Sequence, residues 1–505
     1  MANTLFFSPV SSFPQFDELY VISDLHLGGP SNFQIFNSAT ELRYLIDYLK
    51  NHLPSKTIAL VINGDLVDFL AENQAKYFDP GGAVGKLNRI AGDPSFKDVF
   101  AALKDFANTK NRRLIINLGN HDLELALPWV RAELLRILSG GNEAASARIT
   151  FAFDGTGFPC KVGTATVLCV HGNEVDAWNL SDYEVIRRYA REIIQGRSIN
   201  DWIPNAGTQL VIDVMNDLKR QYPFIDLLKP ETGAVLPILF ALAPDQRNKL
   251  IALSATAGRL AWDSARRSTG FLGSEKNELR DQTIASENIL SSGSGNFSKL
   301  RFDKDYDRQY AEMLLDGTEE RFNQRINPMA LVGEDKSGGT LGLISAIRKF
   351  IQGEDVCEVL REVLSDIGND RSFDPSAEDQ TFHLLDEYVG DGFDFLIAGH
   401  THLARALPRK KKHGWYFNSG TWVRLIKLES RVLNDAQEFR KVFEAFKHGT
   451  MVALDNSLNL VLRKLNVVVI GSDSKQTYGE LREVNPDENG HIFQHVNNDY
   501  RFTKN

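Results

Sequence analysis

The chain has 505 residues, of which 43% are hydrophobic, so it could form several domains and has ample material for a large core. Its formal net charge of −9 argues against a globally basic surface for nucleic acid, although a local basic groove is not excluded. The three cysteines, Cys160, Cys169 and Cys357, are too few and too scattered for a disulfide framework or a thiolate metal site. We therefore expect a reducing, cytoplasmic setting.

Neither a secretory signal nor a transmembrane segment is expected. Residues Met1 to Phe16 lack a basic start followed by a long apolar run. The nearest candidate for a span, Ala234 to Ala243, is short and contains Pro237, which favours a buried helix or the wall of a pocket. A role at a membrane surface stays open but is less favoured.

The first third of the chain alternates predicted strands and helices. Runs of apolar and β-branched residues predict strands, and apolar residues at helical spacing predict helices. In chain order these elements are a strand at Leu19 to Ser23, a helix at Ala39 to His52, a strand at Thr57 to Asn63, a helix at Ser95 to Asn108, a strand at Arg113 to Leu118 and a helix at Leu123 to Leu138. Such a series implies a sheet covered by helices.

The pattern changes after a further predicted strand, Thr166 to Val170. Helical periodicity then prevails, at Tyr183 to Gln195, Thr208 to Gln221, Pro244 to Arg259, Lys304 to Leu315 and Val356 to Ile367. Strand character returns at Asp394 to Ala398, Trp415 to Asn418, Trp422 to Leu428 and in the tail from Met451 to Ile470. We therefore predict a catalytic core in two parts, 1–178 and 386–505, interrupted by a mainly helical insertion or cap, 179–385.

Five polar motifs directly follow five of the predicted strands. They are Asp24-Leu25-His26, Gly64-Asp65, Gly119-Asn120-His121-Asp122, His171-Gly172-Asn173 and Gly399-His400-Thr401-His402. Each motif alone is ordinary turn chemistry. Loops at the carboxyl ends of strands in α/β proteins face one crevice, however, so all five should meet there. Together they supply the nitrogen and oxygen ligands of a two-metal hydrolytic site.

Hydrolysis of a phosphoester needs a nucleophilic hydroxide, neutralisation of the phosphoryl oxygens and a proton for the leaving group. Two divalent ions about 3.5–4 Å apart meet the first two needs, by acidifying a bridging water and clamping the phosphate. A carboxylate can offer one oxygen to each ion while cancelling charge. Asp65 is the candidate for this bridging role.

The order of the motifs resembles the calcineurin-like metallophosphoesterase superfamily. The resemblance implies an α/β fold with a four-layer αββα core, in which two packed mixed β-sheets are flanked by helices, here with a large helical insertion. It implies two divalent metal ions, with Mn favoured and Fe, Zn, Co or Ni also compatible with the ligands. Asn418 to Thr421 resembles the strand and turn that close the family core, and we expect a supporting role for it.

The same resemblance assigns roles to individual residues. Around one metal it puts Asp24, His26, Asp65 and His402; around the other it puts Asp65, Asn120, His171 and His400. His121 would donate a proton or contact the phosphate, and Asp122 would orient its ring. Asp68 and Asp176 are interpreted either as groups that hold ligand histidines or as polar loop residues, with the first slightly favoured.

The segment Ser23 to Gly28, with the GDLVD and HGNEVD stretches, is most similar to the branch that contains the UDP-2,3-diacylglucosamine pyrophosphohydrolases. The predicted function is hydrolysis of a phosphodiester or pyrophosphate bond in a small substrate, nucleotide-linked substrates included, by a hydroxide that bridges the two metals. A nuclease of the same superfamily is the alternative, so nucleic acid is a possible but not favoured partner. A catalytically inactive scaffold would instead be expected to lack ligands. No oligomeric state is predicted.

Two other features bear on the substrate. The insertion begins after His171 and ends before His400, so we expect it to cap the metals and select the substrate. The basic run Arg409 to His413 is either an anion contact near the crevice or a solvated turn between two strands, and the turn is favoured.

Overall fold

The computed structural model describes most of the two predicted core segments and the two ends of the predicted insertion. The described residues are 12–221 except 32, 177–178, 200–201 and 203; Leu227; 355–427 except 368–370 and 372; 430–448; Met451; and 461–504 except 474–475, 488–491 and 494–499.

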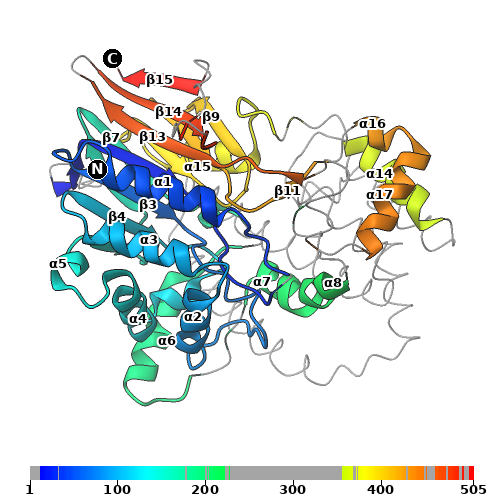
Figure 1. The fold of residues 1–505 in the computed structure, drawn as a ribbon, viewed down its shortest axis with the longest axis horizontal. Helices are drawn as coiled ribbons and strands as arrows, with labels where there is room; N and C mark the ends of the chain where they lie inside the picture. Colours follow the sequence, from blue (N-terminus) through cyan, green and yellow to red (C-terminus); the bar gives the residue numbers. More distant parts are fainter. Residues whose placement is uncertain are drawn as a thin grey trace, which may run out of the picture.

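Two mixed β-sheets form the centre of the fold (Figure 1). The first has seven strands, in the order β15 (Arg501–Lys504), β14 (Thr477–Glu483), β13 (Asn466–Ser472), β2 (Glu18–Ile22), β3 (Ile58–Asn63), β4 (Arg112–Asn117) and β5 (Ile149–Ala152). Strands β2 to β5 run parallel, whereas β13 pairs antiparallel with β2. The C-terminal part of the chain therefore completes the sheet that the N-terminal part begins.

The second sheet has six strands and also joins distant parts of the sequence. Its order is β1 (Gln15–Phe16), β6 (Phe158–Val162), β7 (Ala165–Cys169), β8 (Phe395–Ala398), β10 (Trp415–Ser419) and β9 (Ala404–Pro408). Strands β7, β8 and β10 run parallel, so their carboxyl ends lie at one edge. A separate two-stranded ribbon pairs β11 (Leu425–Ile426) with β12 (Val461–Leu462).

The two sheets pack face to face with helices on their outer faces. One apolar cluster joins Val21 and Val61 of the first sheet to Val167, Ile397 and Phe417 of the second. The helices over the outer face of the seven-stranded sheet are α1 (Ala39–Asn51), α2 (Ala83–Gly92), α3 (Lys97–Asn108) and α4 (Pro128–Ser139), with the short α5 (Glu143–Ser146) beyond them. Helix α15 (Gln380–Tyr388) covers the outer face of the six-stranded sheet. The predicted arrangement of two mixed sheets flanked by helices is confirmed.

The predicted helix over Leu123 to Leu138 is interrupted. A 3₁₀ turn, Leu123–Ala126, is followed by α4, which begins at Pro128. Leu127 is extended, with φ −69° and ψ 129°, because the ring of a following proline disfavours the helical conformation. Proline is well suited to the first helical position, where no backbone N–H is needed. The break therefore follows from Pro128.

The described ends of the predicted insertion are helical. They contain α6 (Tyr183–Ile194), α7 (Ala206–Leu210), a π-helical turn (Val211–Met215), α8 (Asn216–Gln221) and α14 (Val356–Ile367). The helices predicted at Pro244 to Arg259 and Lys304 to Leu315, and the apolar run Ala234 to Ala243, lie outside the described residues. The boundaries 1–178, 179–385 and 386–505 stay predictions.

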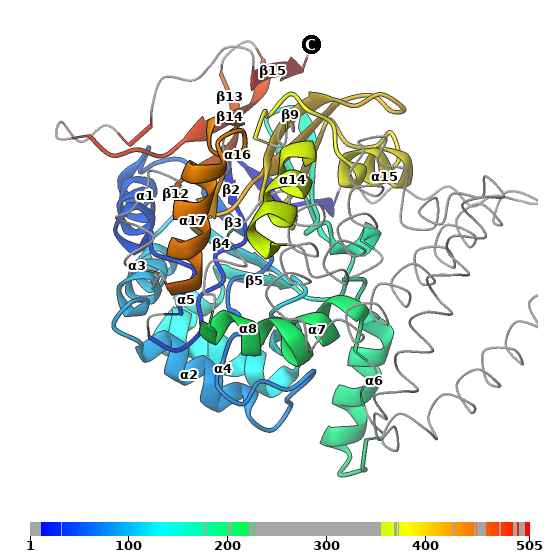
Figure 2. The ribbon, with the colours of Figure 1, turned by 90° about the vertical axis from the view of Figure 1, so that its right-hand side faces the viewer.

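Helix α14 packs with two helices from the C-terminal part of the chain, α16 (Ser430–Leu433) and α17 (Ala436–His448) (Figure 2). The Arg361 guanidinium donates to the Leu433 carbonyl at 3.0 Å, which ties α14 to the end of α16. Among the helices that the structure describes, none has the length and apolar character needed to span a bilayer.

Candidate metal centre

The five motif loops meet at the carboxyl ends of strands from both sheets. Backbone hydrogen bonds tie the loops together: the His26 N–H donates to the Asp65 carbonyl at 2.9 Å, and the Gly399 N–H donates to the His171 carbonyl at 2.8 Å. The Asp24 carboxylate accepts the His400 N–H at 2.9 Å, which links the first motif to the last. Residues that are far apart in sequence are thus held around one point, as the motif order predicts.

The Asp65 carboxylate lies between two histidine rings. Its Oδ2 atom is 3.5 Å from His26 Nε2 and 3.3 Å from His171 Nε2. On the His26 side, Asp24 Oδ1 is 3.3 Å from His402 Nε2, and the facing ring nitrogens of His26 and His402 are 3.0 Å apart. Three overlapping groups have ligand atoms close enough to share a cation: Asp24, His26 and His402; Asp24, Asp65 and His171; and His26, Asp65 and His121.

The donor set fits divalent cations. His171 Nδ1 lies 2.8 Å from the Asn63 carbonyl, which fixes the ring so that its other nitrogen, Nε2, faces Asp65. That Nε2 and the amide oxygen of Asn120 are buried and make no hydrogen bond to a described residue. Buried polar atoms without a partner are rare because they lose their hydration. Carboxylate oxygens, imidazoles and an amide suit Mn, Fe, Zn, Co or Ni.

Backbone strain is concentrated at the same residues. Eight described residues other than glycine have positive φ, and five of them are predicted ligands: Asp24, His26, Asp65, His400 and His402, with φ from 48° to 68°. Such conformations cost of order 1–3 kcal/mol each and persist only where surrounding contacts enforce them. The hydrogen bonds between the loops hold these residues in their positive-φ conformations. The strained backbone thus coincides with the residues that gather at the candidate metal centre.

Two glycines make the close approach of the loops possible. Gly64 has φ +92°, and a Cβ there would collide with the His171 ring. A Cβ on Gly119 would collide with the carboxylate and backbone nitrogen of Asp65. The glycines of the second and third motifs therefore allow Asp65 and His171 to pack against the backbone.

The carboxylate beside His121 is that of Asp68. Asp68 Oδ1 is 3.2 Å from His121 Nδ1, and its Oδ2 is 3.3 Å from His26 Nδ1. The role of Asp122 in orienting His121 stays a prediction; its oxygens accept the backbone N–H groups of Gly119 at 2.7 Å and Leu66 at 2.9 Å. Asp122 thereby joins the second and third motif loops.

Within the cluster, neighbouring opposite charges raise the pKa values of two histidines and lower that of one aspartate. Burial acts to lower the pKa of His121, but the negative charges of Asp68 and Asp65 outweigh it and raise the pKa to about 9. His171 behaves alike: Asp65 raises its pKa to about 10 in spite of burial. For Asp24, burial is outweighed by the hydrogen bond from His402 and nearby histidine charges, which lower the pKa to about 2. The carboxylates attract positive charge, and a divalent cation would provide it.

The last motif is supported from two sides. His400 Nε2 is 2.7 Å from Asp176 Oδ2, so Asp176 holds the ring through this nitrogen. Nδ1 is then the ring nitrogen that could bind a metal. The Asn418 amide donates to the Gly399 carbonyl at 2.7 Å and to the Thr401 hydroxyl at 3.1 Å. The supporting roles predicted for Asp176 and for the segment from Asn418 are confirmed by these contacts.

The basic run Arg409 to His413 forms the turn between β9 and β10. Arg409 is buried, with its Nε 2.9 Å from Asp386 Oδ1. Lys410 pairs with Glu378 at 2.6 Å, and Lys411 pairs with Glu387 at 2.7 Å. The charges are matched by neighbouring carboxylates, which agrees with the turn interpretation.

Sequence reasoning missed two contributors to the site. The Asn63 carbonyl that orients His171 is a backbone group, and no residue pattern marks it. Lys219, from the predicted insertion, shares a cavity with His26 and Asp68. Only its place on a helix was predictable.

Comparison with known proteins supports the family expected from the motifs. Residues 18–226 match the family model described as calcineurin-like phosphoesterase. The matched segment contains Asp24, His26, Asp65, Asn120 and His171, and the loop with His400 and His402 lies beyond it. No curated protein matches the chain. Over residues 18–226, the chain is therefore similar to the calcineurin-like phosphoesterase family.

Proposed function

We propose that the protein is a dinuclear metal-dependent phosphoesterase that hydrolyses a phosphodiester or pyrophosphate bond in a small substrate. The observation that carries this proposal is the position of Asp65. Its carboxylate lies within 3.5 Å of ring nitrogens of His26 and His171, which come from the two different sheets. A carboxylate between two sets of donors suits a bridge between two cations.

The residues divide into two sets around Asp65. Asp24, His26 and His402 would complete one metal site, and Asn120, His171 and His400 would complete the other. When bound, the two ions supply Lewis acidity, which activates water near neutral pH and neutralises the phosphoryl oxygens. Mn is the favoured metal, and the ligands also suit Fe, Zn, Co or Ni.

His121 is proposed to give a proton to the leaving oxygen of the substrate. Its Nδ1 faces Asp68, so the ring is fixed through one nitrogen and Nε2 is left to transfer the proton. His121 would carry this proton before the reaction, and the carboxylate of Asp68 beside its Nδ1 favours the charged ring. Breakage of the bond from phosphorus to the leaving oxygen then transfers that proton.

The similarity of Ser23 to Gly28 to the UDP-2,3-diacylglucosamine pyrophosphohydrolases supports a pyrophosphate bond as the target. A nuclease would need a basic surface beside the site. The basic run Arg409 to His413 does not provide one, because its described arginine and lysines are paired with carboxylates.

The test uses the purified full chain, stripped of metal with a chelator and then supplied with Mn²⁺. Bis(p-nitrophenyl) phosphate, a UDP-linked sugar and DNA are the substrates. We expect Mn²⁺-dependent hydrolysis of one or both small substrates and none of DNA. The Asp65→Asn variant should be inactive, whereas Asp47→Asn, which alters an exposed carboxylate on α1, should match the wild type. Cleavage of DNA alone, or full activity in the chelator, would contradict the proposal.

A further inference from the structure

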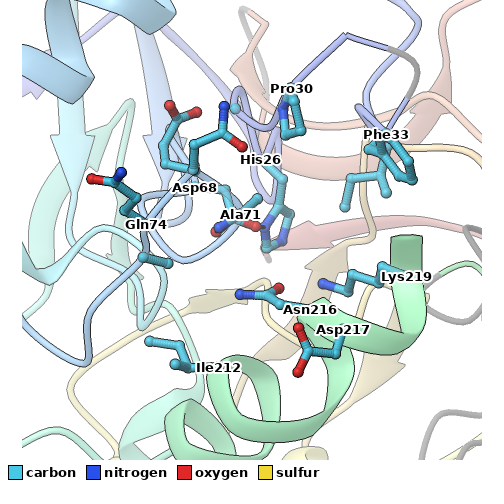
Figure 3. A pocket seen from close by; sticks show the side chains of 15 residues that line it. His26, Pro30, Phe33, Asp68, Ala71, Gln74, Ile212, Asn216, Asp217 and Lys219 are labelled. Carbon is cyan, nitrogen blue, oxygen red and sulfur yellow. Dashed lines mark hydrogen bonds and ion pairs between the residues drawn. The ribbon is translucent and has the colours of Figure 1, made fainter. Parts of the chain in front are cut away.

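A cavity of about 170 Å³ opens beside the metal centre, next to His26 (Figure 3). Its walls are the loop after β2, the loop after β3 and the helical segment Ile212 to Lys219 from the predicted insertion. Pockets that enclose a whole small ligand have about 300–1,000 Å³. This cavity therefore has room for one group of a substrate whose reacting bond lies at the metals.

The helical wall is fixed to the core by polar contacts. The Tyr77 hydroxyl donates to Asp213 Oδ1 at 2.6 Å, and the Asn216 amide donates to the Leu70 carbonyl at 2.9 Å. Both partners in the core lie on the loop after β3, which also carries Asp68. Lys219, one turn after Asn216, is thereby placed on an anchored element, and its side chain extends into the cavity (Figure 3).

Lys219 is the one lysine or arginine among the described residues that line the cavity. Two of the three carboxylates in the lining are already held: Asp68 faces His26 and His121, and Glu72 pairs with Arg89 and accepts the Gly29 N–H at 2.8 Å. The third, Asp217, is exposed.

Lys219 also lies beside the candidate metal centre. The cavity that it lines is bounded by His26, a predicted ligand, and by Asp68, whose Oδ1 is 3.2 Å from His121 Nδ1.

We propose that this cavity binds the phosphoryl group adjacent to the scissile one, and that Lys219 is the residue that recognises its charge. The inference rests on the proposed function and deepens it, since it selects a pyrophosphate over a simple phosphodiester as the preferred substrate class. A lysine ammonium is a compact point charge that binds phosphate oxygens. Pro30, Phe33 and Ile212 give the same cavity apolar walls, which suit the carbon skeleton attached to that phosphoryl group.

The test compares Lys219→Met with the wild type on two substrates, in Mn²⁺-loaded full-length protein. The first is a UDP-linked sugar, which has a second phosphoryl group, and the second is bis(p-nitrophenyl) phosphate, which has none. Loss of a charged hydrogen bond should lower kcat/KM for the UDP-linked sugar by about 10-fold or more, and change that for the diester by less than about 2-fold. Lys219→Arg should retain most activity on both, because it keeps the charge.

Lys76→Met is the matched control, because Lys76 lies on the loop after β3 but is exposed, pairs with Asp79 and does not itself line the cavity. It should leave both substrates unaffected. A binding measurement complements the kinetics: the inhibition constant of methylenebisphosphonate should rise about 10-fold in Lys219→Met, while that of inorganic phosphate should stay unchanged.

The outcomes separate the two proposals. If the wild type hydrolyses neither substrate, the proposed function fails. If the wild type is active but Lys219→Met retains full activity on the UDP-linked sugar, or loses activity equally on both substrates, the proposed phosphoesterase function stands and the inference about Lys219 is overturned.

Discussion

Asp68 Oδ1 lies 3.2 Å from His121 Nδ1, and this contact joins the loop after β3 to the loop after β4 directly beside the candidate metal centre. The other oxygen of the same carboxylate is 3.3 Å from His26 Nδ1, so one side chain holds a proposed proton donor and a proposed metal ligand. Leu70 and Ala71 donate backbone N–H groups to Oδ1, which fixes the carboxylate itself. Both rings therefore lie against a carboxylate that the backbone of its own loop holds in place.

Replacement of His121 by alanine should slow the chemical step while the metals stay bound. A positioned proton donor contributes about 10²–10⁴-fold, so kcat should fall within that range. Metal content by mass spectrometry should match that of the wild type. His383→Ala, which removes an exposed histidine paired with Glu378, is the control and should have no effect. Loss of metal in His121→Ala would reassign His121 as a ligand, as its place near His26 and Asp65 allows.

Asp68→Asn should reduce kcat by about 10–100-fold, the usual effect of removing a carboxylate that holds such a histidine. If Asp68 acts through His121, Asp68→Asn in a His121→Ala background should lower kcat much less, because the histidine on which Asp68 acts is already absent. Steady-state kinetics on the four proteins gives the coupling directly. Fully additive losses would show that Asp68 acts through another residue, such as His26.

Gly64→Ala should destabilise the protein and disturb the metal centre, because the added Cβ would meet the His171 ring at a residue whose φ is +92°. We expect a loss of about 2 kcal/mol or more in the free energy of unfolding. Gly85→Ala, at an exposed position on α2 with open space around it, should instead stabilise by about 0.5–1 kcal/mol. Denaturant unfolding measures both. Equal effects of the two changes would contradict the crowding argument.

Glu124 should make the protein less stable as pH rises. Its carboxylate is buried, and burial raises its pKa from 4.5 to about 7, although it accepts the Asp79 N–H at 2.9 Å. Below pH 4.5 the group is protonated in both folded and unfolded states and has no effect. Between about pH 4.5 and 7 the unfolded state loses its proton first, so stability falls by up to about 3 kcal/mol.

Glu124→Gln removes this titration and should flatten that part of the stability curve, measured by urea unfolding at several pH values. Glu387→Gln, at an exposed carboxylate on α15, should leave the curve as it is. A decline of unchanged size in Glu124→Gln would show that another group titrates.

The sequence is a good guide to the strands and their loops. The buried strands β2, β3 and β4 begin and end within about one residue of their predicted limits, since unbroken apolar runs are typical of strands covered on both faces. Pro128 could have marked the start of α4. The pairing of β13 with β2 could not be predicted, because it depends on packing between segments at opposite ends of the chain.

In the candidate site too, some features could be predicted from the sequence and others could not. Residue types and order predict Asp24, Asp65 and His171 as ligands, and the structure brings these three side chains together. The contact of Asp68 with His121 could not be predicted from the sequence, since it depends on which groups each carboxylate meets after the loops fold. Neither could the strained backbone at the predicted ligands, which arises from contacts between loops of different strands.

The central claim is that Asp65 joins two metal sites, and calorimetric titration of metal-free protein with Mn²⁺ tests it most directly. The wild type should bind about two ions per chain, as a two-metal centre requires. Asp65→Asn should bind neither tightly, whereas Asp47→Asn should match the wild type. The absence of Mn²⁺ binding in the wild type, or unchanged binding in Asp65→Asn, would contradict the account.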